Sequence, residues 1–177
     1  MSIEIWDVLD ENGRPTGKTT LRGQGVLKSG EYHLVVHIWI ISSSGSFLIQ
    51  RRAEDKKLMP GEWAATGGAA VSGEDSFTAA KRELFEELGI KSDRESLKKI
   101  TRIKRRSSLL DVWAIVCDIP ESELVLQRSE VAEAKWVTKE ELCEMIKGGS
   151  FHNYGKEYFD CIFEKSESLR GAVIYES

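Results

Sequence analysis

One helical segment most constrains how this chain of 177 residues can fold. Between Asp75 and Leu88, apolar residues recur at the three- and four-residue spacing of a helix, and Gly89 stands where a left-handed C-cap is expected. The apolar positions are Phe77, Ala80, Leu84 and Leu88. They form a stripe along one side of the helix, and this stripe is expected to face the core.

The same helix carries three carboxylates beside the apolar stripe. Glu83, Glu86 and Glu87 lie three and four residues apart, and at about 100° per residue the first and last are about 40° apart around the helix. Like charges at this spacing destabilise an isolated helix. One interpretation is an acidic face exposed to solvent. The other is a site for a hard divalent cation such as Mg²⁺, which prefers carboxylate and carbonyl oxygens.

The residues around the carboxylates favour the cation site. Gly67 and Gly68 precede the helix, and a glycine pair lets the backbone approach a ligand or a metal closely. Arg82 stands next to Glu83, in position to donate hydrogen bonds to a carboxylate of the cluster. We therefore expect a metal site where the glycine loop meets the helix.

The rest of the chain predicts a mixture of strands and helices. Runs of β-branched and aromatic residues, bounded by turn signals such as Asn12–Gly13, predict the strands. The predicted strands are Ile5–Leu9, Leu34–Ile41, Phe47–Arg51, Leu109–Cys117 and Ala134–Val137. Further helices are predicted over Thr138–Ile146, with Thr138 as N-cap, and over Lys156–Phe163. This mixture predicts an α/β or α+β fold layered around one sheet, and the length suits a single domain over residues 1–177.

Composition narrows the class of protein. With 41% hydrophobic and 31% charged residues, the chain reads as globular rather than disordered, and its net charge of -4 argues against a general nucleic-acid binder. The three cysteines are widely spaced and form no CxxC pair, which predicts a reducing compartment and a cytoplasmic protein. The most apolar run, Leu34–Ile41, is too short to span a bilayer, so no membrane partner is expected.

The glycine loop and the helix together resemble the complete Nudix box. The matching residues are Gly68, Glu74, Arg82, Glu83, Leu84, Glu86, Glu87, Gly89 and Ile90. The flanking segments Leu48–Arg52 and Pro60–Trp63 resemble the subgroup similar to isopentenyl-diphosphate isomerase. The resemblance implies an α/β/α sandwich with a central mixed β-sheet. It also implies a hydrolase for a diphosphate that is linked to another group, here expected to be a small nucleoside diphosphate derivative.

The resemblance also implies roles for the residues of the box. Glu83 and Glu87 would bind Mg²⁺ or Mn²⁺, and Glu86 would join them as a ligand or orient the attacking water. The carbonyl of Gly67 or Gly68 would complete the metal shell. The remaining two residues, Arg82 and Glu74, would hold the loop and the helix together. Nudix proteins often dimerise, so a homodimer is an open expectation.

The expected reaction needs a proton acceptor for water. A divalent ion neutralises the diphosphate and lowers the pKa of bound water, so the protein mainly positions the reacting groups. In the family the acceptor is a glutamate of the box, such as Glu86, or a glutamate in a later loop. The later candidates are Glu130 and Glu133, and we favour Glu130 because a loop residue can swing over the site.

Basic residues outside the box are candidates for binding phosphate. Arg51, Arg52 and Lys57 lie near the box in sequence, and arginine suits bidentate phosphate contacts. A second basic cluster, Lys98–Arg106, could hold phosphates or an RNA backbone, or could be a solvated loop or edge strand. For Lys98 and Lys99 in that cluster, we favour the solvated interpretation.

Two histidines could point to a different site. His33, His37 and Trp39 share one face of a strand because side chains alternate along it. Resemblance to the isomerase subgroup would make His33 a metal ligand, whereas packing against the sheet is the commoner use of such residues. Trp39 could stack on a flat substrate group, although a core position is commoner.

Two other functions compete with hydrolysis. Isomerase chemistry would need a cysteine and a metal-binding histidine near the strand that leads into the box, and Trp63–Thr66 contains neither. A non-catalytic ligand sensor on the same scaffold would usually have lost glutamates of the box or gained a DNA-binding domain. Neither feature is present in the sequence, so hydrolysis of a small diphosphate is the favoured function.

Overall fold

The computed structural model of the protein describes residues 4–25 and 27–175. Of the single domain predicted over residues 1–177, residues 1–3, 26, 176 and 177 therefore lie outside the described part. The strands are β1 Ile5–Leu9, β2 Pro15–Leu21, β3 His33–Ile41, β4 Phe47–Arg52, β5 Trp63–Ala64, β6 Thr66–Ala69, β7 Lys98–Lys104, β8 Ser108–Val116 and β9 Val131–Val137. The helices are α1 Ser76–Leu88, the 3₁₀ turn η1 Glu121–Glu123, α2 Lys139–Gly148 and α3 Lys156–Tyr175.

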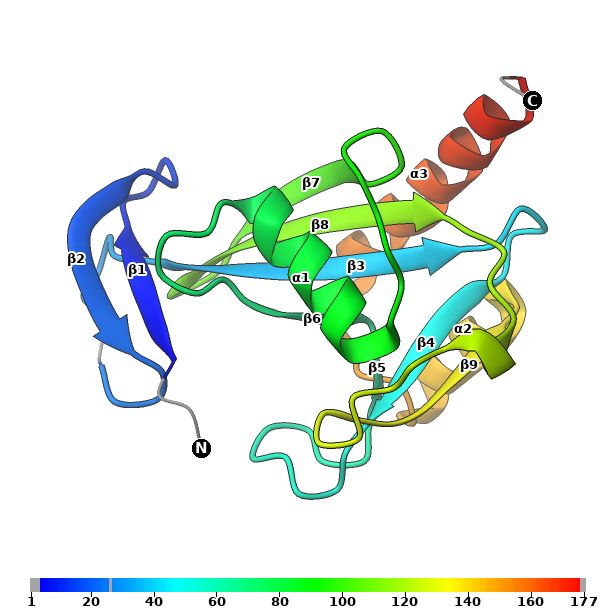
Figure 1. The fold of residues 1–177 in the computed structure, drawn as a ribbon, viewed down its shortest axis with the longest axis horizontal. Helices are drawn as coiled ribbons and strands as arrows, with labels where there is room; N and C mark the ends of the chain where they lie inside the picture. Colours follow the sequence, from blue (N-terminus) through cyan, green and yellow to red (C-terminus); the bar gives the residue numbers. More distant parts are fainter. Residues whose placement is uncertain (1–3, 26, 176–177) are drawn as a thin grey trace.

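The central strand of the main sheet is β3, which is almost wholly apolar (Figure 1). It pairs in parallel with β8 along its whole length, from His33 opposite Ser108 to Ile41 opposite Val116. On its other edge, the middle of β3, from Val35 to Ile38, pairs with β6, and its last two residues pair with β4. The other pairings in the sheet are antiparallel, so the sheet is mixed, as expected.

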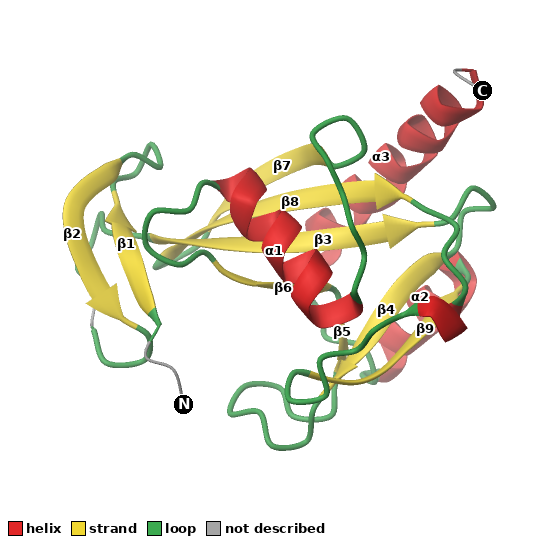
Figure 2. Cartoon of the chain, in the orientation of Figure 1, coloured by secondary structure: helices red, strands yellow, loops and turns green. Residues whose placement is uncertain are grey.

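Helices cover both faces of this sheet (Figure 2). Alternate residues of β3, among them Val36 and Ile38, pack in one buried cluster with Ala80, Leu84 and Leu88 of α1. The intervening residues, including Trp39, pack on the opposite face in a second cluster to which α2 and α3 contribute. The predicted α/β/α sandwich is therefore confirmed, and the apolar stripe of the first helix faces the core.

The predicted caps at Gly89 and Thr138 are present. Gly89 ends α1 at φ 75°, while Asp75, predicted as the first helical residue, is instead the N-cap, its side chain accepting a hydrogen bond from the backbone N–H of Thr78. At the start of α2, Thr138 and Glu141 form a reciprocal capping box. The last helix runs well beyond the predicted Lys156–Phe163 and ends at Tyr175.

Two segments form strands in addition to those predicted. The predicted turn at Asn12–Gly13 is followed by a mostly exposed strand, β2, which forms a separate two-stranded sheet with β1. The basic segment forms β7 at the edge of the main sheet, one of the two alternatives considered. Lys98 and Lys99 are both exposed on this edge strand, as favoured, and Lys99 Nζ in addition lies 2.7 Å from the buried Asp111 carboxylate.

None of the helices formed by residues 4–25 and 27–175 combines the length and the apolar character needed to cross a bilayer.

Candidate active site

The glycine pair of β6 brings the backbone against both β3 and the acidic helix. A Cβ at Gly67 would overlap the carbonyl of Val36, and a Cβ at Gly68 would overlap the carboxylate of Glu83. Glycine is therefore required at Gly67, where the obstacle is backbone, whereas a side chain at Gly68 would displace the Glu83 carboxylate. As a result, the start of β6 lies directly beside the carboxylates in the second half of α1.

Glu87 is the most deeply buried carboxylate of the cluster, with only 4% of its surface exposed. Its Oε2 accepts hydrogen bonds from Gln50 Nε2 at 2.8 Å and from the backbone N–H of Gly67 at 3.1 Å. Burial, followed by the charge of Glu83, raises the pKa of Glu87 to about 8. In the described part of the chain, no lysine or arginine forms an ion pair with Glu87.

Arg82 links the loop before the helix to the helix itself. Its guanidinium donates to both carboxylate oxygens of Glu74, at 2.7 and 2.9 Å, and to the carbonyl of Ala69 at 3.2 Å. It also donates to Glu83 at 2.9 Å and to Glu86 at 3.0 Å. Glu83 is largely buried, whereas 46% of the Glu86 side chain is exposed. Burial raises the pKa of Glu83 despite the opposing effect of Arg82.

The oxygen atoms gathered here, from carboxylates and a glycine backbone, are of the kind that binds a hard divalent cation. Two buried carboxylates, Glu83 and Glu87, lie beside a glycine backbone, and the raised pKa of each reflects negative charge that burial leaves poorly stabilised. Among the residues that the structure describes, no three acidic, histidine or cysteine side chains already converge as a metal-binding group. Arg82 occupies one oxygen each of Glu83 and Glu86, so convergence requires those two side chains to turn.

Of the two later glutamates, Glu130 lies nearer the cluster. Its charge contributes to the raised pKa of Glu87, and its backbone carbonyl accepts from the N–H of Ala53 at 2.9 Å. The Glu130 carboxylate forms an ion pair with Lys56, whose side chain is largely buried. Glu133 instead points toward Arg51 at 3.3 Å, with half of its side chain exposed.

The predicted phosphate-binding residues are placed differently from one another. Arg51 pairs with Glu54 and Glu133, and Arg52 Nε donates to the carbonyl of Leu58 at 3.0 Å. Lys57 is exposed, and its neighbour Lys56 is the lysine that reaches Glu130. Sequence reasoning missed Lys56, because the two adjacent lysines give no signal of which one turns inward.

Both histidines of β3 lie on the face opposite α1. The His33 ring stacks on Trp6, and its Nδ1 lies 2.9 Å from the carbonyl of Ser107. His37 Nδ1 lies 2.9 Å from the hydroxyl of Tyr158, and burial lowers the pKa of His37 to about 3. Trp39 is fully buried and donates to the same hydroxyl. His37 and Trp39 therefore pack in the core, whereas His33 is only partly buried beside Trp6; all three lie on the face of β3 opposite the acidic helix.

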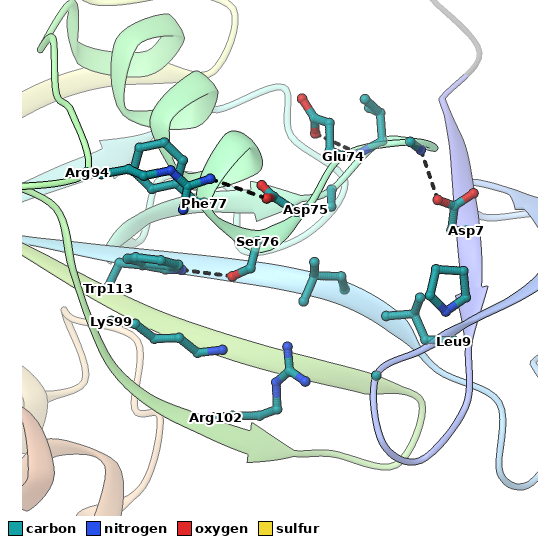
Figure 3. Close-up of a pocket in the computed structure, with 16 residues that line it drawn as sticks. Asp7, Leu9, Glu74, Asp75, Ser76, Phe77, Arg94, Lys99, Arg102 and Trp113 are labelled. Atoms are coloured by element: carbon teal, nitrogen blue, oxygen red, sulfur yellow. Dashed lines mark hydrogen bonds and ion pairs between the residues drawn. The ribbon is translucent and has the colours of Figure 1, made fainter.

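A cavity of about 560 Å³ lies at the other end of the helix, between the N-terminus of α1, the β1–β2 hairpin and strands β7 and β8 (Figure 3). Trp113 donates to the Ser76 hydroxyl at 2.9 Å along its wall. Lys99 and Arg102 also line it, and both donate to the fully buried Asp111. The carboxylates Glu83 and Glu87 do not line this cavity.

Comparison with known proteins agrees with the geometry. The NUDIX domain family matches residues 31–157. The chain is 42% identical over 153 residues to an uncharacterised Nudix hydrolase of Listeria monocytogenes, covering 86% of this chain and 90% of that protein. An isopentenyl-diphosphate Delta-isomerase of Pectobacterium atrosepticum is 35% identical over only 85 residues, which cover 48% of this chain and 46% of the isomerase.

A solved structure extends the likeness to the fold. The crystal structure of DR0079 from Deinococcus radiodurans superposes with a TM-score of 0.72 at 26% identity, covering 85% of this chain and 93% of that one. The box resemblance, the sandwich and these matches agree, and the chain therefore belongs to the Nudix family of hydrolases.

Proposed function

We propose that this Nudix hydrolase cleaves the diphosphate linkage of a small organic diphosphate, with Mg²⁺ or Mn²⁺ bound at the acidic helix. The observation that carries the proposal is Glu87, a buried carboxylate beside Glu83 with no cationic side chain of the described chain paired to it. A carboxylate in such a place is stabilised best by a cation from solution. Glu83, Glu87, Glu86 and the carbonyl of Gly68 would hold this ion.

Each residue of the site then has a defined task. When bound, the divalent ion supplies charge neutralisation for the diphosphate and a lower pKa for water. Glu83 and Glu87 hold their carboxylates toward the glycine backbone, while Arg82 and Glu74 keep the loop and the helix in register. Glu86 is exposed, and once its side chain turns away from Arg82 it can orient the attacking water or bind the ion.

Glu130 is the proposed proton acceptor. It lies near Glu87 on a loop that is anchored by the backbone bond from Ala53, so its carboxylate can move while its backbone stays in place. Lys56 holds this carboxylate before substrate binds. A diphosphate would attract Lys56 and release Glu130 to accept a proton from water, with Arg51, Arg52 and Lys57 as further phosphate contacts.

The substrate and setting are also proposals. A nucleoside diphosphate derivative remains the expected substrate, and the widely spaced cysteines favour a reducing, cytoplasmic setting. A homodimer is expected from the habit of the family.

A substrate panel tests the proposal directly. Nucleotides, nucleotide coenzymes, nucleotide sugars and prenyl diphosphates are incubated with the protein and Mg²⁺ or Mn²⁺, and released phosphate is identified. We expect cleavage of at least one nucleoside diphosphate derivative, abolished by EDTA and restored by metal. Conversion of isopentenyl to dimethylallyl diphosphate, or activity unaffected by EDTA, would contradict the proposal.

A further inference from the structure

Gln50 is a buried polar residue beside the acidic helix that lies outside the Nudix box. It lies on β4 with only 1% of its surface exposed, and β4 approaches the C-terminal half of α1 (Figure 1). Its Nε2 donates to Glu87 Oε2 at 2.8 Å. Its Oε1 is buried and has no hydrogen-bond partner among the described residues.

This arrangement is unfavourable for Gln50 itself. A buried acceptor left without a partner loses its hydrogen bonds with water and gains none in return, so an apolar side chain of the same size would suit the site better if packing alone decided. Turning the amide over would not help, because Oε1 would then face the acceptor oxygen of Glu87. The burial of Gln50 is therefore explained by what its amide does to Glu87.

The hydrogen bonds on Glu87 are unequal. Gln50 Nε2 and the Gly67 N–H both donate to Oε2, at 2.8 and 3.1 Å. Among the described residues, Oε1 receives no such bond. One oxygen of Glu87 is thus held by the protein and the other is left to bind a cation.

We infer that Gln50 is a positioning residue that makes Glu87 a one-oxygen metal ligand and so selects small octahedral cations over Ca²⁺. The inference rests on the proposed metal site. Mg²⁺ demands near-ideal octahedral geometry, whereas Ca²⁺ accepts more oxygens and often takes both oxygens of a carboxylate. With Oε2 committed to two N–H donors, the two-oxygen mode that suits Ca²⁺ is disfavoured.

Direct metal binding tests this inference without measuring turnover. Mn²⁺ dissociation constants are measured by electron paramagnetic resonance, with Ca²⁺ as competitor, for the wild type, Gln50→Met, Glu87→Gln and the double variant. Gln50→Met keeps the side-chain length but removes the amide. We expect it to weaken Mn²⁺ binding about 10-fold or more, in the range known for residues that orient metal ligands, and to lower the preference for Mn²⁺ over Ca²⁺.

The double variant shows whether Gln50 acts through Glu87. If it does, adding Gln50→Met to Glu87→Gln changes Mn²⁺ affinity little, because the group that Gln50 positions is already altered. Additive losses would contradict the inference. The exposed glutamine Gln24 provides a matched control, since Gln24→Met should leave both affinities unchanged.

Further outcomes separate the possible failures. Wild-type affinity and selectivity in Gln50→Met would overturn the role of Gln50 while leaving the metal site intact. Mn²⁺ binding that is unaffected by Glu87→Gln would overturn the proposed metal site, and the role of Gln50 with it. If circular dichroism shows that Gln50→Met does not fold, Gln50→Asn replaces it. The shorter side chain keeps an amide but withdraws the donor from Glu87, and the same loss of selectivity is expected.

Discussion

Two buried carboxylates, one on α1 and one on the sheet, have opposite electrostatic surroundings. Asp111 on β8 is fully buried and accepts hydrogen bonds from Arg102 at 2.6 and 2.8 Å and from Lys99 at 2.7 Å. Glu87 is almost as buried, but its donors are an uncharged amide and a backbone N–H. The protein supplies the countercharge for Asp111 and omits it for Glu87. The difference separates a carboxylate that is paired within the fold from one whose surroundings fit the cation site that we propose.

The two surroundings act in opposite directions on the pKa. Burial alone would raise the pKa of Asp111, but hydrogen bonds from Arg102 and Lys99 lower it below the ordinary value. Burial and the neighbouring Glu83 raise the pKa of Glu87 to about 8, and the bonds from Gln50 and Gly67 do not compensate. The comparison predicts that replacing each carboxylate affects a different property, namely activity at Glu87 and stability at Asp111.

The largest expected effect is on catalysis. Glu87→Gln should lower metal-dependent turnover at least about 100-fold, because the neutral amide is a poor ligand for a hard cation. The fold should survive, since the amide removes a buried charge. Steady-state kinetics on the cleaved substrate measures the loss, with Glu144→Gln on the exposed face of α2 as the matched control. Unchanged turnover in Glu87→Gln would end the interpretation of this residue as a metal ligand.

The next effect is on stability. Asp111→Asn should lower the free energy of unfolding by about 2 kcal/mol, because Lys99 and Arg102 lose their shared partner but, being about one-third exposed, regain some water. Turnover per folded molecule should be nearly unchanged. Urea denaturation measures the difference, and Asp160→Asn, which removes an exposed ion pair with Lys156 on α3, is the control. A large loss of turnover with normal stability would show that Asp111 serves the reaction.

A third effect is on how stability depends on pH, and it has opposite signs for the two carboxylates. In metal-free protein, the pKa of Glu87 is raised from 4.5 to about 8. The contribution of Glu87 to the free energy of unfolding is therefore complete below pH 4.5 and is lost as the pH rises toward 8. The slope reaches about 1.4 kcal/mol per pH unit. Asp111, with its lowered pKa, contributes at neutral pH and loses that contribution as pH falls through its folded-state pKa.

Urea denaturation of chelated protein between pH 5 and pH 8.5 measures these slopes. Glu87→Gln should match the wild type at the acidic end and become more stable than it toward pH 8, because the amide carries no charge to bury. The difference between wild type and Asp111→Asn should instead stay nearly constant over this range, because the pKa of Asp111 is lowered from 3.8 and its contribution to stability is lost only at more acidic pH. A gap between wild type and Glu87→Gln that stays constant with pH would show that Glu87 does not titrate in this range.

The sequence predicted the box carboxylates because their spacing alone places them on one side of a helix. It could not predict Gln50, because a single glutamine in the strand run Phe47–Arg52 gains its role only when β4 lies beside Glu87. The pairing of Asp111 likewise depends on register, since Arg102 stands opposite it only once β7 aligns with β8. Contacts within one helix are encoded locally, whereas contacts between strands depend on the assembled sheet.

The smallest expected effect concerns two adjacent lysines in the loop after β4. Lys56 is largely buried against Glu130, whereas Lys57 is exposed. If a metal supplies the missing countercharge at Glu87, replacing either lysine should change Mn²⁺ affinity little. Lys56→Met should raise KM about 10-fold, equivalent to about 1.4 kcal/mol, by removing a largely buried phosphate contact. Lys57→Met removes a further proposed phosphate contact from an exposed side chain, so it should raise KM by a smaller factor, about 2-fold. A weakened Mn²⁺ affinity in Lys56→Met would mean that this lysine helps to organise the carboxylates, and the contrast with Asp111 would then be one of degree.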